Sequence, residues 1–168
     1  MNVFLTSVLI LVIICLTVIT VAGFRRYYNY IGFYILIRNR YRYRVEVCDM
    51  WLSAYQKNRD IGSFLRERDI DSVVIYGLGT LGVRLYNELK KDKSIRISCA
   101  VKNPFETDRQ YTLPDLPVID SVDALEDKNA AVIVTEFFEY AKVKDELNDK
   151  GFNTIYSLDE ILQTMLDP

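Results

Sequence analysis

An uninterrupted apolar run opens the chain. Val3–Gly23 reads VFLTSVLILVIICLTVITVAG and contains no charged residue. As a helix rising 1.5 Å per residue, it spans roughly 30 Å, the hydrocarbon thickness of a bilayer. Its few hydroxyl side chains can bond back to their own helix. The pattern predicts a retained membrane-spanning helix. A buried helix of a soluble core and a cleaved signal peptide are the alternatives, and both normally have shorter apolar stretches.

Aromatic residues and arginines follow this run. Residues 24–44 read FRRYYNYIGFYILIRNRYRYR, and their apolar piece Tyr30–Ile37 is too short to span. Tyr and Arg favour the headgroup layer of a membrane. We therefore expect an interfacial segment, with membrane lipids contacted through residues 3–44. A surface for a protein partner remains open, whereas nucleic acid is not expected beside a membrane helix.

Helical periodicity returns after the basic segment. Apolar residues recur at helical spacing between Val47 and Tyr55, and a second short helix is predicted over Ile61–Arg68 with Asp60 as its N-cap. A buried β-branched run then begins an alternation of strands and helices. The predicted strands are Ser72–Tyr76, Ile95–Val101, Pro117–Ile119, Ala130–Thr135 and Thr154–Tyr156.

Helices are predicted between these strands. They cover Val83–Lys91, a turn at Ser121–Leu125, Tyr140–Lys150 with Gly151 as its stop, and a last helix opened by the capping box Ser157–Glu160, while residues 103–116 form a loop. Alternating βα units predict an α/β fold, a five-stranded parallel doubly wound Rossmann-like sheet preceded by one N-terminal transmembrane helix. The expected domains are an anchor (1–24), juxtamembrane interfacial and linker helices (25–58) and a Rossmann-like domain (59–168).

A glycine pattern lies between the first strand and its helix. Gly77, Gly79 and Gly82 fit G-x-G-x-x-G, in which the glycines permit a tight turn, close approach of a pyrophosphate and close helix–strand packing. The helix N-terminus offers free amides to an anion. A turn without a ligand is the alternative. The predicted cofactor-binding residues are Gly77, Leu78, Gly79, Thr80, Leu81, Gly82, Lys102 and Thr135.

One position departs from the dinucleotide pattern. The acid that binds the ribose hydroxyls is expected at the end of the second strand, where this chain has Lys102 and then Asn103. An ammonium group cannot accept a hydroxyl hydrogen, although it can face a 2′-phosphate. This disfavours NAD, leaves NADP open and favours a nucleotide sugar or an empty loop.

Charge and composition narrow the chemistry. Residues 1–44 hold six Arg and no acid, whereas the rest carries 15 basic and 23 acidic residues. Arginines directly after the apolar run place the C-terminal body in the cytoplasm by the positive-inside rule, and an acidic body does not suit nucleic acid.

The chain has no His, which removes His-based catalysis and most zinc sites, so no metal is expected. Three isolated cysteines indicate no disulfide framework, and Cys99 is expected to be a small core residue.

Candidate catalytic residues are few. Two Tyr-x-x-x-Lys pairs, Tyr86/Lys90 and Tyr140/Lys144, have the spacing that short-chain dehydrogenases use, but neither stands in the expected unit. Only five strands are predicted, without a substrate domain, so no catalytic residue is assigned. Glu136 and Glu139 follow the fourth strand and could touch a ligand, although a solvated helix start, which the helix dipole favours, is the preferred explanation.

These segments resemble Rossmann-like domains of bacterial surface-polysaccharide and glycan loci. The matching pieces are IGSFLRERDIDSVVIYGLGTLGVRLYNELKKD, PVIDSVDAL, AAVIVTEF and IYSLDEIL, within about two-thirds of the chain. Similar modules precede the catalytic domains of membrane-bound nucleotide-sugar dehydratases and sugar acetyltransferases. The resemblance implies a membrane-anchored, non-catalytic module that binds a nucleotide or nucleotide sugar and works with a glycan-biosynthesis enzyme or as a homo-oligomer. The alternatives are an NADP-dependent reductase or epimerase acting on a nucleotide sugar, and a ligand-free scaffold.

Overall fold

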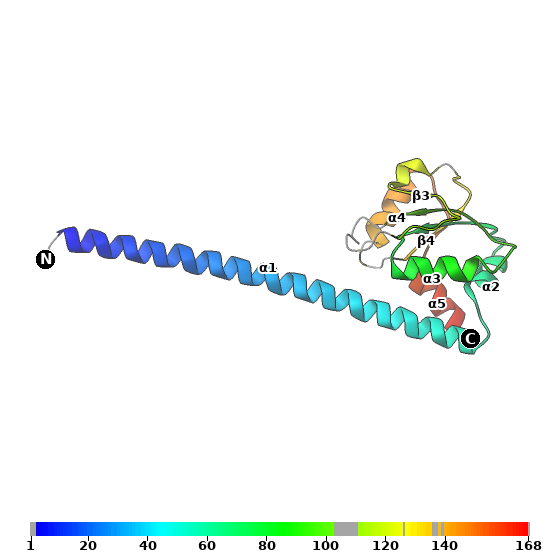
Figure 1. Ribbon diagram of the computed structural model, residues 1–168, viewed down its shortest axis with the longest axis horizontal. Coiled ribbons are helices and arrows are strands. Elements are labelled where there is room, and N and C mark those ends of the chain that lie inside the picture. Colours follow the sequence, from blue (N-terminus) through cyan, green and yellow to red (C-terminus); the bar gives the residue numbers. More distant parts are fainter. Residues whose placement is uncertain (1–2, 103–110, 126, 136–137, 139, 168) are drawn as a thin grey trace. The chain divides into compact units, whose positions relative to one another are not determined.

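The computed structural model describes residues 3–102, 111–125, 127–135, 138 and 140–167 (Figure 1). The chain divides into two compact units, residues 1–42 and 43–168. Three residues considered as candidates in the sequence, Asn103, Glu136 and Glu139, lie outside the described residues, as do residues 103–110 of the predicted loop.

A single helix, α1 (Val3–Gln56), takes up the first third of the chain. The sequence led us to expect an anchor, an interfacial segment and a linker helix as separate pieces. They are continuous because no proline occurs in this range, and its two glycines, Gly23 and Gly32, each cost a helix only about 1 kcal/mol.

In the first unit, the large apolar side chains of α1 from Val8 to Val21 are exposed. Those between Val8 and Val21 are 46% to 67% exposed. The hydroxyls of Thr17 and Thr20 donate to carbonyls of the preceding turn, at 2.8 Å to Ile14 and 2.7 Å to Leu16, as expected for hydroxyls in an apolar helix. By length and composition this helix can cross a membrane.

The second unit contains an all-parallel sheet. Its strands are β1 (Ser72–Tyr76), β2 (Arg96–Val101), β3 (Val118–Ile119), β4 (Ala131–Val134) and β5 (Ile155–Ser157). Their order is β3-β2-β1-β4-β5. The prediction of five parallel strands is confirmed, with ends shifted by at most one residue. Tyr76 pairs with Val101 on one side and Val134 on the other, so the carboxyl ends of three strands meet at one edge.

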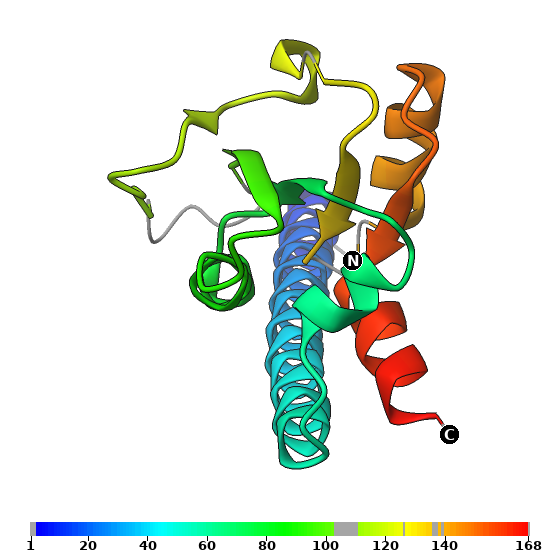
Figure 2. The same cartoon turned by 90° about the vertical axis from the view of Figure 1, so that its right-hand side faces the viewer.

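Helices cover both faces of the sheet. They are α2 (Ile61–Arg66), α3 (Thr80–Leu89), the 3₁₀ turn η1 (Val122–Ala124), α4 (Tyr140–Asp149) and α5 (Leu158–Leu166). One core packs Val73 and Ile75 against α2, α3, α5 and the end of α1, and the other packs Val74 and Val132 against η1 and α4. Figure 2 shows α3 (green) and α5 (red) below the strands and α4 (orange) above them.

Local signals set the helix ends. The Asp60 carboxylate accepts from the Ser63 amide at 2.7 Å, and Ser157 and Glu160 form the predicted capping box. Gly151 has a φ of +88° after α4, where a glycine costs least. Helix α3 begins three residues before its predicted start, because Gly79 of the glycine motif is its N-cap.

The last turns of α1 belong to the sheet unit. Val47 and Ala54 are 0% exposed in its core, and the Tyr43 hydroxyl donates to Asp159 of α5 at 3.2 Å. The compact unit therefore starts at Tyr43, well before the boundary at residue 59 that the strand pattern suggested.

Candidate functional site

The glycine turn follows β1 at the carboxyl edge of the sheet. Gly77 has a φ of +95°, in the left-handed region that favours glycine. The amides of Gly77 and Leu78 both donate to the Val101 carbonyl, at 3.1 and 3.0 Å, and the Gly79 amide donates back to the Gly77 carbonyl at 2.7 Å. The turn is thus fixed to the end of β2 as well as to β1.

Close packing makes Gly82 necessary. A Cβ atom built on Gly82 would lie 2.4 Å from the Gly77 carbonyl oxygen, a backbone atom that cannot rotate away. Gly79 is different, since its φ of −105° and ψ of −159° are extended values that any residue adopts. The roles predicted for Gly77 and Gly82 therefore have direct geometric counterparts, while that of Gly79 depends on a ligand.

The first turn of α3 presents unused donors. Among the described residues, no acceptor is found for the amides of Thr80, Leu81 and Gly82. Leu78 and Leu81 are buried in the core, each only 4% exposed, so only their backbones face the carboxyl edge of the sheet. The Thr80 hydroxyl lies 3.2 Å from the Tyr111 hydroxyl. These amides and the positive end of the helix dipole form a potential anion site.

Thr135 holds the turn in place from the neighbouring strand. Its side chain is buried directly after β4, and its hydroxyl donates to the Gly77 carbonyl at 2.6 Å and lies 3.2 Å from the Tyr76 carbonyl. Its amide also donates to Tyr76 at 3.0 Å. The residue predicted to touch a cofactor therefore also positions the glycine turn.

Replacing Thr135 with valine is expected to lower the unfolding free energy by about 1–2 kcal/mol, because an isosteric methyl leaves the buried Gly77 carbonyl with one donor fewer. Urea denaturation of the full chain in detergent measures the change. Thr135→Ser is the control, since it keeps the hydroxyl. An unchanged unfolding free energy for Thr135→Val would contradict the prediction, because it would show that the hydroxyl does not stabilise the turn.

Lys102 lies at the predicted end of β2 but has a partner. Its ammonium group is 2.5 Å from a carboxylate oxygen of Asp120, directly after β3. Both side chains are largely exposed, so the pair contributes little stability. The pair instead lowers the local positive charge, because Asp120 offsets the Lys102 ammonium group that would attract a 2′-phosphate.

The second Tyr-x-x-x-Lys pair, Tyr140/Lys144, is not arranged for proton transfer. The Tyr140 hydroxyl donates to a Glu160 oxygen at 3.1 Å. Burial, followed by the charge of Glu160, raises the pKa of Tyr140 to about 12, the opposite of what a catalytic tyrosine needs. Lys144 lies over the Tyr140 ring at 5.5 Å, and Lys90 pairs with Asp115 at 2.6 Å.

The raised pKa of Tyr140 predicts a loss of stability at alkaline pH. The folded state keeps this proton up to about pH 12, whereas an unperturbed tyrosine has a pKa of 10.0. The stabilisation is full below pH 10 and is lost as the pH rises toward 12. Unfolding of the wild type and of Tyr140→Phe, compared between pH 8 and 12, tests this. Parallel pH curves would contradict it.

Cys99 is not arranged as a nucleophile. Cys99 lies in β2 and contacts the core, where burial raises the pKa of its thiol and disfavours the nucleophilic thiolate. Within the described parts of the chain, no group of three or more His, Cys, Asp or Glu side chains could hold a metal.

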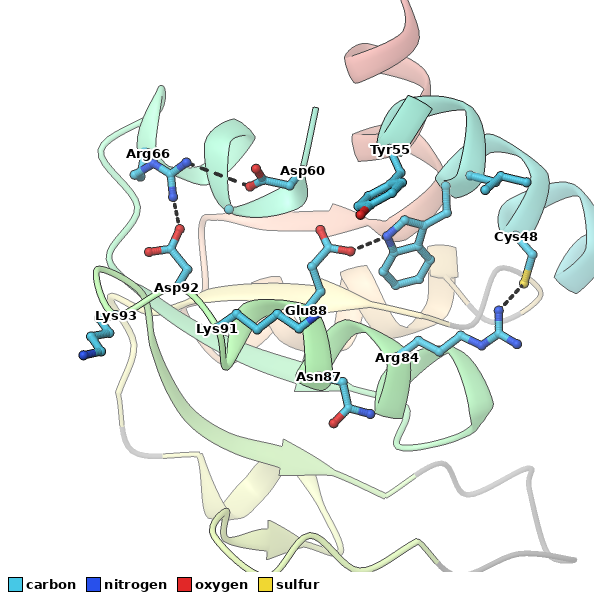
Figure 3. A pocket seen from close by; sticks show the side chains of 13 residues that line it. Cys48, Tyr55, Asp60, Arg66, Arg84, Asn87, Glu88, Lys91, Asp92 and Lys93 are labelled. Carbon is cyan, nitrogen blue, oxygen red and sulfur yellow. Dashed lines mark hydrogen bonds and ion pairs between the residues drawn. The ribbon is translucent and has the colours of Figure 1, made fainter. Parts of the chain in front are cut away.

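An open pocket of about 740 Å³ lies away from the glycine turn, between the end of α1, α2 and α3 (Figure 3). Its polar groups largely satisfy one another. The Glu88 carboxylate accepts from the Trp51 indole and, at 2.8 Å, from the Ile61 amide. Arg66 pairs with Asp92. We interpret this pocket as a junction of helices.

Two contacts at the site were not anticipated from the sequence. Tyr111 and Asp120 approach Thr80 and Lys102 from distant parts of the chain. The contact of Asp120 could have been anticipated, because Asp120 follows a strand that neighbours β2 and parallel strands end at the same edge of the sheet. The contact of Tyr111 could not, since Tyr111 lies in a segment without periodicity.

The fold and site define an α/β domain with a glycine turn and a free helix N-terminus at the carboxyl edge of a parallel sheet. In the comparisons with known proteins, no protein-family model, curated protein or solved structure matches this chain.

Proposed function

We propose that the chain is a membrane-anchored, non-catalytic module that binds a nucleotide or nucleotide sugar and serves bacterial cell-surface polysaccharide assembly on the cytoplasmic face. The observation that carries the proposal is the row of amides at Thr80, Leu81 and Gly82, which has no acceptor among the described residues. Amides at a helix N-terminus suit a diphosphate.

The position of these amides supports a nucleotide ligand. The domain is proposed to be Rossmann-like and doubly wound, which agrees with the strand order β3-β2-β1-β4-β5 and with helices on both faces. In such folds ligands bind outside the carboxyl ends of the strands, where the strand order reverses. That point lies between β1 and β4, beside Gly77 and Thr135.

The distribution of charge supports a nucleotide sugar over NADP. A 2′-phosphate would meet the Lys102–Asp120 pair, whose charges cancel. An NADP-dependent reductase or epimerase is the second candidate, and the Lys102 ammonium at the end of β2 is the observation in its favour. A ligand-free scaffold that recruits a glycan enzyme is the third.

Thermal shift assays on the full chain in detergent separate these candidates. UDP-sugars are expected to raise the melting temperature more than NADP or NAD. Gly79→Asp should abolish the shift, because a carboxylate at the N-cap repels phosphate. Gly79→Asn is the matched control. Both side chains can cap α3, and the backbone of Gly79 accepts either, so the difference between them isolates charge. No shift with any nucleotide would favour the scaffold, and turnover of a nucleotide sugar would contradict a non-catalytic role.

The anchor and its orientation form the second part of the proposal. About 20 apolar residues cross a bilayer, so much of the 54-residue helix α1 would stand outside the hydrocarbon core. Arg25, Arg26, Tyr27 and Tyr28 would lie at headgroup level, where they contact lipids. A reporter at the C-terminus is expected to be accessible only from the cytoplasmic side, and labelling from outside intact cells would overturn this orientation.

A further inference from the structure

The end of α1 carries two apolar faces, and the sheet domain covers mainly one of them. Its core-facing residues are Tyr43, Val47, Met50, Trp51 and Ala54. A second row consists of Val45, Cys48, Leu52 and Tyr55, spaced by three, four and three residues. Val45, Leu52 and Tyr55 are 68%, 55% and 74% exposed, although they lie in the folded unit, while Cys48 is half-buried and also contacts the core. Figure 3 shows Cys48 and Tyr55 on the rim of the pocket, with Arg84 of α3 donating to the Cys48 sulfur at 3.1 Å.

This spacing is the heptad pattern of a two-stranded coiled coil. With Val45 and Leu52 at positions a, Cys48 and Tyr55 take positions d. The core-facing residues then occupy c, f and, with Trp51, one g position, on the back and one flank of the helix. The domain therefore covers mainly the side that a coiled coil leaves free. It touches the side that a partner helix would need only at Cys48.

The sequence extends the same register upstream. Alternating steps of four and three residues lead back from Val45 through Tyr41, Arg38, Tyr34, Ile31 and Tyr27 to Phe24. Two heptads are short for a stable coiled coil, and these residues add three more. Arg38 is the one charged residue in the row, and a polar residue at an a position specifies alignment at some cost in stability.

We propose that this row, the α1 seam (Val45, Cys48, Leu52 and Tyr55), is the contact surface for a second copy of the chain in a parallel homodimer. Charge complementarity indicates that the partner helix is a second copy of the chain. In this register Arg44 is at g and Asp49 at the e position that follows, so a parallel pair of identical helices brings each Arg44 opposite the partner's Asp49. The parallel alignment also agrees with the proposed anchor, which would hold both helices in one membrane with the same orientation.

Cysteine cross-linking in native membranes tests the seam. In the full chain with Cys15 and Cys99 replaced by serine, Cys48 is expected to form a disulfide with Cys48 of the second copy under a mild oxidant, because d residues face each other across a parallel pair. The matched control moves the cysteine to Glu46, at position b on the exposed side away from the seam. At least tenfold less dimer is expected there. Leu52→Asp, an exposed substitution, should abolish the Cys48 product while the chain still unfolds cooperatively.

A charge exchange tests the register. Asp49→Arg alone should reduce the Cys48 dimer severalfold by placing two cations opposite each other, and adding Arg44→Asp should restore it. Equal cross-linking at positions 46 and 48, a product that survives Leu52→Asp, or a disulfide to a different protein would overturn the proposal. These readouts need no nucleotide, so a failed seam is distinguishable from a failed ligand site.

Discussion

Replacing Gly82 with alanine is expected to lower the unfolding free energy by about 3 kcal/mol, at the upper end of the cost of overpacking. The new methyl group would lie 2.4 Å from the Gly77 carbonyl oxygen. That oxygen already accepts from the Gly79 amide and the Thr135 hydroxyl, so moving it also disturbs both hydrogen bonds. Either α3 or the glycine turn must shift, and any nucleotide-dependent thermal shift should be lost with it.

Gly62→Ala is the control for this variant. Gly62 is also buried in a helix, and a methyl group there meets only side-chain ends, at 2.6 Å from Asp92 and 2.9 Å from Asp60. The Asp92 carboxylate can rotate away, whereas the Asp60 carboxylate caps α2, so the loss should be about 1 kcal/mol, the typical value of an N-cap. Urea unfolding of both variants in the full chain makes the comparison. Equal losses would show that the close contact between α3 and the glycine turn does not constrain the fold.

The strands of the sheet were largely predictable because their signals are local. Each buried strand is a short β-branched run, and the connecting helices have an apolar face or a cap that the sequence displays. Ser157 with Glu160 and the left-handed Gly151 are examples in which one or two residues determine an element end. The five strands were therefore found to within one residue at each end.

Helix α1 was harder to interpret because its parts differ in composition but not in conformation. The change from apolar residues to Arg and Tyr near Gly23 suggested a boundary, yet no residue there ends a helix. A boundary between structural units is set by contacts, and those that bring Val47 and Ala54 into the sheet core come from far along the chain. Periodicity shows that a helix has an apolar face without showing what covers it.

The site was predictable in its backbone and less so in its side chains. Spacing alone located Gly77 and Gly82, whose roles depend on covalent neighbours and local packing. The inward hydrogen bonds of Thr135 and the pairing of Lys102 with Asp120 depend on which strands are adjacent. A motif therefore locates the free amides, while the strand order decides which side chains surround them.

Removing residues 1–58, the segments that precede the sequence-predicted Rossmann-like domain, is expected to leave a largely unfolded fragment. The 59–168 fragment lacks Val47 and Ala54, which are 0% exposed in the core, and the partly buried Met50 and Trp51. Losing their burial costs roughly 5 kcal/mol at the usual value per apolar side chain. Small domains have only about 5–15 kcal/mol in total. The Trp51–Glu88 and Tyr43–Asp159 hydrogen bonds are lost as well.

The 43–168 fragment is the matched comparison, since it adds just these turns of α1 and none of the apolar N-terminal run. It should unfold cooperatively in urea, whereas 59–168 should lack a cooperative transition and expose its sheet core to hydrophobic dyes. A more specific variant replaces Ala54 with aspartate in the 43–168 fragment, which buries a charge against the core and should reproduce the loss. Ser53→Asp, on the neighbouring and less buried position, should have a small effect. A cooperative 59–168 fragment of equal stability would show that the end of α1 is only an appendage of the sheet domain.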